Sequence, residues 1–522
     1  MPTTTPAHEP ARTNDPREAV SLRRVAGRGA LASAGVEMGG RALSLLLSLA
    51  VARTLGPKET GLLGLAVLFS ALVSFVGALP ETAAVAAPRE RTDNSWALAA
   101  CLLRILALLA MGVVAALVFF VVYPHSRYAG ADAAPRLLWI SGILLLIPLF
   151  EGINTYPQIV FQRELRLSAP IRAQGAQYLV SSVAGLGALA LGLGIEGVAM
   201  AAALGALIAS FFLWAQAWGK LGPTPHLERT QVLQLAVGTG RIAVGNVGGY
   251  VFGRIDNVLV ATSLGATAMG LYAMAWNTSR LPLFILSRPV TVALLPALAS
   301  IQGDAARVTR GIRECLTLLF IVLGGCSAAV AVSAPSLVSV VLGPKWLPIV
   351  PCLRLMALTA FVSVLAPIGS ALLTAAGQAH VQLWPAVLGI ACFLLLMPPV
   401  ATRYGLLGAV FVDLLAASSV TLATYVLARR SLPDVKWWSR EQLPPVLAVI
   451  SAALVAWLVG RAAGSSSWRL IVEFCMLGGS YVGFLRLFGG RELFRSIREL
   501  VRRLVLPNSG GLAGRGTPAV PD

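Results

Sequence analysis

Fourteen stretches of apolar residues, most of them about twenty residues long, run almost end to end through this 522-residue chain. A helix needs roughly 20 apolar residues to cross the hydrocarbon core of a bilayer. Only 12% of the residues are charged, about half of the roughly 25% that is usual in soluble domains. The pattern predicts an all-α polytopic membrane protein. It excludes a soluble enzyme, a disordered chain and a secreted disulfide scaffold.

The predicted spans are joined by short loops. They cover residues 31–52, 60–79, 96–122, 137–156, 170–193, 196–218, 242–263, 268–298, 316–338, 353–376, 382–400, 405–427, 443–460 and 470–488. Membrane glycosyltransferases and ligases usually need a sizeable loop that carries catalytic carboxylates, and this chain has none. We therefore expect no catalytic residues and no enzyme activity.

Positive charge is distributed unevenly between the loops. If the N-terminus is inside, 27 of the 41 Lys and Arg residues fall in inner segments and nine fall in outer loops. An excess of Lys and Arg marks the cytoplasmic side of a membrane protein. We therefore expect a multi-pass membrane protein with both termini in the cytoplasm. This topology accounts for the net charge of +18 without a nucleic-acid partner.

Cysteine and histidine offer little for metal or nucleophilic chemistry. None of the six cysteines forms a CxxC pair, and of the four histidines only His380 lies at the end of a span. Metal sites and disulfide frameworks usually show characteristic Cys and His spacings. The sequence thus predicts no metal site and no bound cofactor.

The chain contains an internal repeat. Residues 52–84 and 261–293, at an offset of 209, are identical at 12 of 33 positions without a gap. A second trace pairs Gly194 with Gly405, at an offset of 211. Self-similarity at a fixed period is the signature of a repeated structural unit. Spans one to six and seven to twelve are therefore predicted to be two copies of one unit.

Each copy holds six spans, so both insert in the same orientation and are related by a pseudo-twofold axis along the membrane normal. Parallel halves of this kind are typical of transporters that work by alternating access, with the substrate site between the halves. The predicted organisation is a disordered basic tail (1–28), an N-lobe (29–220), a C-lobe (221–430), two extra spans (431–488), an amphipathic surface helix (489–506) and a disordered tail (507–522).

Three stretches resemble a known family. They are residues 52–66 (ARTLGPKETGLLGLA), 254–304 (beginning RIDNVLVATSLGATAMGLYAMAWN) and 342–358 (LGPKWLPIVPCLRLMAL). Across roughly residues 20–430 their order and spacing are similar to the polysaccharide-exporter (Wzx/WzxC-like) branch of the MOP/MATE exporter superfamily. One departure lies at residues 275–278, where Ala-Trp-Asn-Thr replaces a motif that often carries tyrosine.

The resemblance implies a MATE-like fold and a flippase that moves undecaprenyl-pyrophosphate-linked oligosaccharide units across the inner membrane. These units supply exopolysaccharide, O-antigen or capsule assembly. The implied partners are the lipid-linked oligosaccharide and membrane lipids, with polysaccharide polymerase and glycosyltransferase machinery as further candidates. Two alternatives stay open: an ion-coupled exporter of small drugs from the same superfamily, and a flippase of peptidoglycan precursors.

Charged side chains inside spans are costly, at about 2.5–3.5 kcal/mol each on insertion scales. Arg254, Arg280 and Arg288 lie on the seventh and eighth spans, and their repeat mates in the first half are uncharged. A guanidinium group can bind two phosphate oxygens at once, so these residues are candidates for a pyrophosphate-binding cavity wall. Simpler structural interpretations are that Arg254 pairs with Asp256 and that Arg288 snorkels to the inner surface.

Arg41 joins this candidate substrate-binding set. It follows Glu37 by four residues on one helix face, so a structural ion pair is an equal alternative. Asp256, Glu37 and Glu151 are the candidates for a coupling-ion site. Asp256 is the best single candidate because it lies near mid-span beside the neutral oxygen donor Asn257. Coupling to Na+ or H+ is thus a hypothesis.

Two further in-span charges call for a partner. Arg104 and Glu473 are expected to pair with each other or with nearby polar groups, because a buried charge is costly unless it is paired. Trp276 lies mid-membrane, where it either stacks on a sugar ring or packs against its neighbours.

The predicted topology can be tested with paired fusions of alkaline phosphatase and a fluorescent protein. Because the inner segments carry the positive charge, we expect cytoplasmic signals after residues 225 and 310 and external signals after residues 128 and 345. The opposite pattern of signals would show that both lobes have the reverse orientation in the membrane.

Overall fold

The computed structural model describes residues 16–86, 95–122, 133–164, 166, 168–218, 228–280, 305–363, 365–375, 378–433, 442–462 and 468–505. Within these ranges every regular element is a helix, and nine helical segments are long and apolar enough to cross a membrane. Since the bilayer core offers no water to backbone groups, helices that satisfy their own hydrogen bonds are the expected solution. The prediction of an all-α polytopic chain is confirmed.

The chain forms two compact units. The first unit contains Met1–Leu55 and Leu65–Val244, and the second contains Gly56–Gly64 and Gly245–Asp522. The helix that begins at Pro57 is divided between them, because its residues up to Gly64 belong to the second unit and the rest belong to the first. The second unit therefore includes a short piece of chain from far upstream in the sequence.

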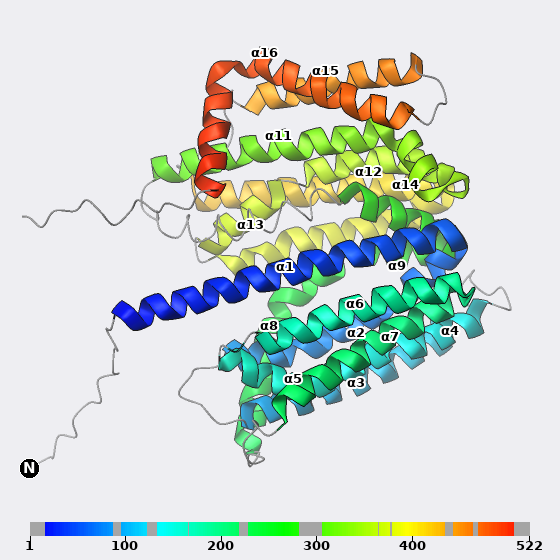
Figure 1. The fold of residues 1–522 in the computed structure, drawn as a ribbon, viewed down its shortest axis with the longest axis vertical. Helices are drawn as coiled ribbons and strands as arrows, with labels where there is room; N and C mark the ends of the chain where they lie inside the picture. Colours follow the sequence, from blue (N-terminus) through cyan, green and yellow to red (C-terminus); the bar gives the residue numbers. More distant parts are fainter. Residues whose placement is uncertain are drawn as a thin grey trace, which may run out of the picture. The chain divides into compact units, whose positions relative to one another are not determined.

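The helices of the first unit are drawn in blue to green in Figure 1. They are α1 (Pro16–Leu55), α2 (Pro57–Ala86), α3 (Ser95–Val122), α4 (Ala133–Leu144), α5 (Leu146–Arg163), α6 (Ser168–Ala190), α7 (Gly194–Ala217) and most of α8 (Arg229–Phe252). Helix α6 packs against both α1 and α7, and α5 packs against α3 and α7. These contacts connect α1, α6, α7, α5 and α3 in that order.

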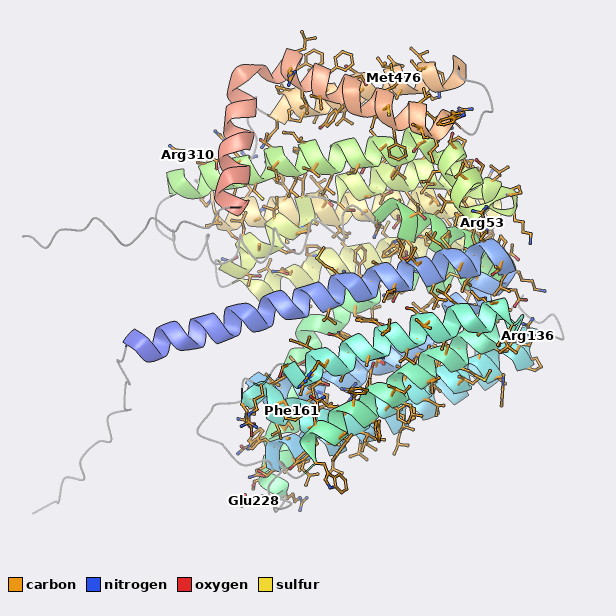
Figure 2. All side chains as sticks on the ribbon, viewed as in Figure 1. Arg53, Arg136, Phe161, Glu228, Arg310 and Met476 are labelled. Carbon is orange, nitrogen blue, oxygen red and sulfur yellow. The ribbon has the colours of Figure 1, made fainter. Side chains whose placement is uncertain are left out.

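Labelled residues in Figure 2 mark the two ends of the helices in the first unit. Arg53 and Arg136 lie at one end, whereas Phe161 and Glu228 lie at the other (Figure 2). Phe161 is buried among small residues and one leucine of α6 and α7, which are Ala169, Ala173, Ala209, Leu213 and Ala217. Small residues let membrane helices approach closely, and this explains the tight packing at that end of α5.

The second unit continues α8 and adds the remaining elements. They are α9 (Ile255–Leu264), the helical residues 266–280, α11 (Ala305–Leu337), a π turn (Val338–Leu342), a 3₁₀ turn (Pro344–Ile349), α12 (Val350–Val362), α13 (Leu365–Ala375), a second 3₁₀ turn (Ala379–Gln382), α14 (Leu383–Ser431), α15 (Leu443–Ala462) and α16 (Arg469–Val505). Helix α14 packs against α9, α12 and α13, and α15 and α16 pack together against α11.

The backbone at four glycines agrees with the sequence repeat. Gly56 and Gly265, 209 residues apart, have φ of 87° and 94°. Gly194 and Gly405, 211 residues apart, both have φ of 63°. Glycine adopts positive φ at little steric cost, and each of these four residues separates two helical segments. The same local turns therefore recur at the offsets that the sequence predicted.

A second pair of repeat-related glycines forms a close helix crossing inside the second unit. A Cβ atom on Gly61 would overlap the Ala266 carbonyl oxygen, and one on Gly270 would overlap the Pro57 carbonyl oxygen. Each added Cβ would also lie 2.9 Å from the backbone nitrogen of the other glycine. The start of α2 and residues 266–270 thus cross in a reciprocal, nearly symmetric way that only glycine permits.

Several helices differ from the predicted spans. Helix α1 begins at Pro16 rather than residue 31, α2 continues past residue 79 to Ala86, and the predicted span 242–263 is divided between α8 and α9. Hydropathy marks the apolar part of a helix, but backbone hydrogen bonding extends a helix through flanking polar residues. The backbone of the predicted surface helix is helical as far as Val505. Arg288 lies outside the described residues.

The glycine crossing generates a direct test of packing. Gly61→Ala is expected to destabilise the protein by about 1–3 kcal/mol, as overpacking does in well-packed cores. Gly64→Ala in the same helix is the matched control, because its Cβ would meet only Met269 Cε, at 3.9 Å. Thermal unfolding of the purified variants measures both, and equal stability would contradict the close crossing.

Candidate functional site

The second unit contains a break between two helices. Helix α8 ends at Phe252, Gly253 and Arg254 form a turn, and α9 begins at Ile255. Arg254 has φ of −138°, outside the helical range, and Asp256 lies in the first turn of α9. Unpaired backbone N–H groups give a helix N-terminus a partial positive charge, which stabilises a carboxylate there. The break thus helps to explain how an acidic residue is accommodated deep in the unit.

Asp256 is held by neutral hydrogen-bond donors. The Tyr272 hydroxyl donates to Oδ2 at 3.0 Å, and the Asn257 side-chain amide donates to Oδ1 at 2.8 Å. All three side chains are buried. Both carboxylate oxygens therefore have a partner, as buried polar groups require. Arg254 is exposed, and among the described residues no ion pair joins it to Asp256.

A second carboxylate lies across from Arg280. Arg280 Nη2 is 3.4 Å from each oxygen of Asp413 on α14, which is long for a charge-assisted hydrogen bond of about 2.7–2.9 Å. The guanidinium carbon lies 4.5 Å from the centroid of the Trp276 ring, within the range of a cation–π interaction. Arg280 Nε is buried and has no hydrogen-bond partner among the described residues. The guanidinium group is therefore oriented but only loosely paired.

These side chains line a cavity of about 330 Å³ within the second unit. Arg280, Asp256 and Asp413 contribute charge to the wall. The aromatic and hydroxyl side chains in the wall are Phe252, Trp276, Phe393, Ser363, Ser370 and Thr421. A few polar groups in an aromatic cavity are typical of a ligand site. The wall offers a guanidinium for an anion, hydroxyls for hydrogen bonding and rings for stacking.

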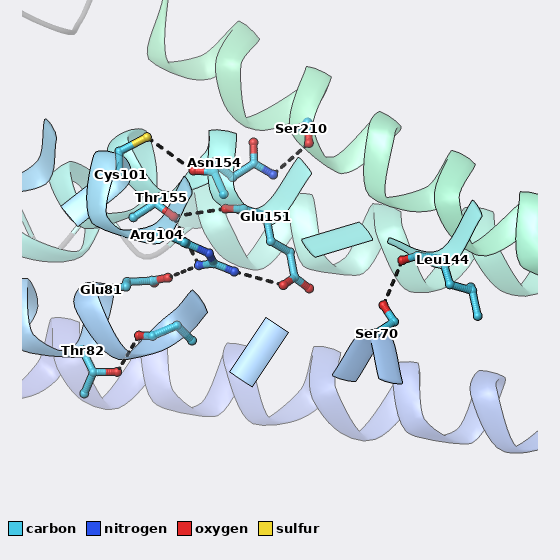
Figure 3. A network of polar contacts seen from close by, with 12 residues as sticks. Ser70, Glu81, Thr82, Cys101, Arg104, Leu144, Glu151, Asn154, Thr155 and Ser210 are labelled. Atoms are coloured by element: carbon cyan, nitrogen blue, oxygen red, sulfur yellow. Dashed lines mark hydrogen bonds and ion pairs between the residues drawn. The ribbon is translucent and has the colours of Figure 1, made fainter. Parts of the chain in front are cut away.

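The first unit has its own buried charge cluster, shown in Figure 3. Arg104 on α3 donates to Glu81 on α2 at 2.8 Å and to Glu151 on α5 at 3.0 Å. It also donates to the Thr155 hydroxyl at 3.2 Å. The Arg104 side chain is only 4% exposed, whereas that of Glu151 is 36% exposed. One guanidinium thus ties together three helices at short distances.

A hydrogen bond next to this cluster adds a fourth helix. The Asn154 side-chain amide on α5 donates to the Ser210 hydroxyl on α7 at 2.9 Å (Figure 3). Buried polar networks of this kind hold helices in one register. In the first unit, short buried hydrogen bonds therefore join four helices. The second unit has the longer Arg280–Asp413 ion pair and the cavity.

The predicted site residues are found in three settings. Arg280 and Asp256 lie together on the cavity wall. Glu37 and Arg41 pair at 2.7 Å on α1, where the Arg41 side chain is 53% exposed. Glu151 faces Arg104, and Arg254 lies at the helix break. None of these placements tests the predicted role of the residue in binding or coupling.

The pairing of other charges differs from the simplest expectation. Arg104 pairs with Glu81 and Glu151, and Glu473 pairs with Arg469 at 2.8 Å, so Arg104 and Glu473 do not pair with each other. Sequence reasoning also missed Glu81, which lies beyond the predicted end of its span. Asp413 lies within the predicted span 405–427, but its partner Arg280 is 133 residues away, so no short sequence pattern indicates the pair.

The described helices form a multi-pass bundle whose fold is similar to that of solved membrane transporters. The inward closed structure of lipid II flippase MurJ aligns with a TM-score of 0.70, covering 90% of this chain and 99% of that one at 12% identity. An inward-facing multidrug resistance MATE family transporter aligns with a TM-score of 0.60, covering 76% and 96% at 16% identity. At such identities the likeness shows the fold alone.

The chain belongs to the family described as "Polysaccharide biosynthesis protein", whose model matches residues 50–351. This match covers more than half of the sequence and confirms the family resemblance.

Curated relatives match a shorter region. An "Uncharacterized membrane protein in cps region" of Klebsiella pneumoniae is 32% identical over 128 residues, 24% of this chain and 26% of that protein. "Lipopolysaccharide biosynthesis protein WzxC" of Escherichia coli (strain K12) is 30% identical over 128 residues, with the same coverage. "Teichuronic acid biosynthesis protein TuaB" of Bacillus subtilis (strain 168) is 24% identical over 131 residues, 25% of this chain and 27% of that protein. The chain thus spans about a quarter of the length of these relatives.

The Arg104 cluster predicts a large stability effect. Arg104→Gln leaves two carboxylates without their cation and is expected to destabilise the protein by about 3–5 kcal/mol. Arg136→Gln is the matched control, because the side chains of the Arg136–Glu196 pair are 43% and 28% exposed, and pairs near the surface contribute about 1 kcal/mol or less. Thermal unfolding in detergent compares the two, and similar losses would show that the cluster is not a structural staple.

Proposed function

We propose that this chain is a flippase for lipid-linked oligosaccharides in the bacterial inner membrane, with both termini in the cytoplasm. It moves undecaprenyl-pyrophosphate-linked repeat units to the outer face by alternating access, for exopolysaccharide, O-antigen or capsule assembly. The observation that carries the proposal is the loosely paired guanidinium of Arg280 on the cavity wall, in a chain of the polysaccharide biosynthesis family.

The cavity wall suits a charged headgroup joined to a sugar. A guanidinium can donate two parallel hydrogen bonds to phosphate oxygens, and Arg280 keeps Nε without a hydrogen-bond partner among the described residues. Trp276 holds the guanidinium by stacking, while Phe252 and Phe393 offer apolar ring faces. In this proposal Arg280 binds the pyrophosphate and the rings and hydroxyls contact the first sugar.

The other arginines predicted from the sequence are further candidates for contact with the substrate. Arg254, at the break between α8 and α9, and Arg41, exposed on α1, are further candidates to meet the anionic headgroup, as is Arg288. Polysaccharide polymerase and glycosyltransferase machinery would supply and consume the translocated unit. Membrane lipids surround the apolar helices.

A second candidate function is supported by the same cavity. Two carboxylates and three aromatic rings line it, and an exporter of small organic cations would use such a wall. A flippase of peptidoglycan precursors would share the pyrophosphate lipid with the first proposal. The experiment must therefore separate an anionic lipid substrate from a cationic drug.

The first test uses cells that lack the chain and carry wild type, Arg280→Ala, Arg280→Lys or Arg403→Ala. A hydrogen bond to a charged group contributes about 1.5–3 kcal/mol of binding free energy. Arg280→Ala is therefore expected to lower the amount of surface polysaccharide about tenfold or more, and the lipid-linked unit should accumulate inside the cells. Arg280→Lys should retain part of the activity. Arg403→Ala is the matched control, because this exposed arginine also lies over an aromatic ring, Tyr404, but does not line the cavity.

The alternatives give different results in the same cells. Unchanged polysaccharide together with increased sensitivity to cationic drugs would favour the drug exporter. Accumulation of a peptidoglycan precursor with cell lysis would favour the peptidoglycan flippase. If wild type and Arg280→Ala restore surface polysaccharide equally, Arg280 does not bind the substrate.

A further inference from the structure

Helix α1 has three different faces along Gly35–Leu55, a segment that is long and apolar enough to cross a membrane. The first face packs against α6 of the same unit (Figure 1). A Cβ atom on Gly40 would overlap the Tyr178 ring, and a Cβ atom on Gly185 would lie 2.9 Å from both methyl carbons of Leu47. This face is therefore fixed by close contacts with a neighbouring helix.

The second face of α1 is polar. Its residues follow one another at intervals of four, three and four positions, and they are Glu37, Arg41, Ser44 and Ser48. Residues at such intervals lie along one side of a helix, and at 1.5 Å per residue this side is about 17 Å long. Arg41 and both serines are exposed, and the Glu37 side chain is 22% exposed. We call these four residues the polar stripe.

The third face of α1 is apolar and exposed. Met38 and Leu46 are 65% and 57% exposed, and Ala42, which lies between them, is also exposed. Met38 and Ala42 each follow a residue of the polar stripe by one position, which is a rotation of about 100° around the helix. The helix thus has a separate surface for lipid chains, and the polar stripe is not part of it.

The charges of the polar stripe exclude hydrocarbon as its surroundings. Ionised side chains within membrane spans are costly, and they face the interior of the bundle or a water-filled space. Glu37 and Arg41 pair with each other at 2.7 Å, yet the Arg41 side chain is still 53% exposed. The polar stripe therefore faces water or a polar ligand.

The two serines of the stripe have hydroxyls that are available to a ligand. Exposed hydroxyls elsewhere in the first unit bond to the backbone: those of Thr54 and Thr82 donate to carbonyl oxygens four residues earlier, at 2.8 and 3.1 Å. Such bonds satisfy a hydroxyl that has no other partner. Within the described ranges, the hydroxyls of Ser44 and Ser48 make no hydrogen bond.

We propose that the polar stripe of α1 binds the glycan of the transported lipid through hydrogen bonds to its sugar hydroxyls. The inference rests on the proposed function, because it requires a glycan on the lipid. The charge of Arg41 is matched by Glu37, so the stripe is neutral as a whole and suits hydroxyl groups better than a second anion. In this inference Arg41 contacts sugar hydroxyls instead of the pyrophosphate.

Sugar hydroxyls match the groups of the polar stripe. A sugar hydroxyl both donates and accepts hydrogen bonds, as a serine hydroxyl does. A carboxylate such as that of Glu37 accepts them, and a guanidinium such as that of Arg41 donates them. A stripe of about 17 Å is longer than one sugar, so it can contact several sugars of an oligosaccharide. Its contribution to binding should therefore depend on the glycan and not on the diphosphate.

The experiment measures binding of two lipids to the purified full chain in nanodiscs. One lipid is undecaprenyl pyrophosphate without sugar, and the other is the lipid-linked oligosaccharide extracted from cells that lack the chain. The double variant Ser44→Ala/Ser48→Ala loses two hydrogen bonds, so we expect it to bind the oligosaccharide lipid about tenfold more weakly than wild type. Its affinity for undecaprenyl pyrophosphate should equal that of wild type.

A matched control comes from the same helix. Thr54→Ala removes an exposed hydroxyl of α1 that lies outside the polar stripe and already donates to the Ala50 carbonyl oxygen. This variant should bind both lipids as wild type does. A tenfold loss of affinity for the oligosaccharide lipid in Thr54→Ala as well would overturn the assignment of the glycan to the stripe.

The two lipids also separate the inference from the proposed function. Arg280→Ala should weaken binding of both lipids to the same extent. If it does, and the double serine variant binds both lipids as wild type does or loses affinity for both equally, the glycan assignment is wrong and the anion site stands. If wild type binds neither lipid, the proposed function fails and the inference fails with it.

A second measurement tests the surroundings of the polar stripe without a ligand. It uses a chain whose six cysteines are replaced by alanine and a charged thiol reagent applied to native membranes. Ser44→Cys and Ser48→Cys are expected to react, whereas Ala42→Cys and Leu46→Cys on the apolar face are not. Unreactive stripe positions, or equal reaction at all four positions, would overturn the proposal.

Discussion

Water is absent from the hydrocarbon core of a bilayer, so every charge placed there must be balanced by the protein itself. This constraint organises both units of the chain. Arg104 draws Glu81 and Glu151 together and fixes three helices relative to each other. In the second unit Arg280, Asp413 and Asp256 occupy one cavity wall. The apolar residues make the chain a membrane protein, and the few charges decide how its helices are positioned.

The two charge clusters differ in a way that suits different tasks. The contacts of Arg104 are short, at 2.8 and 3.0 Å, and a hydroxyl adds a third. Arg280 meets Asp413 only at 3.4 Å and leaves Nε without a hydrogen-bond partner in the described part of the chain. A tight cluster resists rearrangement, whereas a loose one can exchange partners at small cost. The two units thus differ in how closely their buried arginines are paired with carboxylates.

Much of the fold could be predicted because hydropathy and an internal repeat can be read directly from the sequence. The helices follow from hydropathy, and the offset of 209 residues between the Gly56 and Gly265 turns follows from the repeat. The partners of the charges do not, since Tyr272 meets Asp256 across 16 residues and Asp413 meets Arg280 across 133. Glu81 was missed because its helix continues beyond the apolar stretch. Long-range pairing depends on tertiary packing, which one sequence does not encode in any short pattern.

The crossing of Gly61 and Gly270 also limits which residues the chain can carry at these two positions. In most contacts a larger side chain on one helix can be accommodated when the facing residue becomes smaller. Here both positions already have the smallest residue, and each faces backbone atoms of the other helix, so neither can compensate for the other. A side chain at either position could be accommodated only if the backbones of the two helices moved apart.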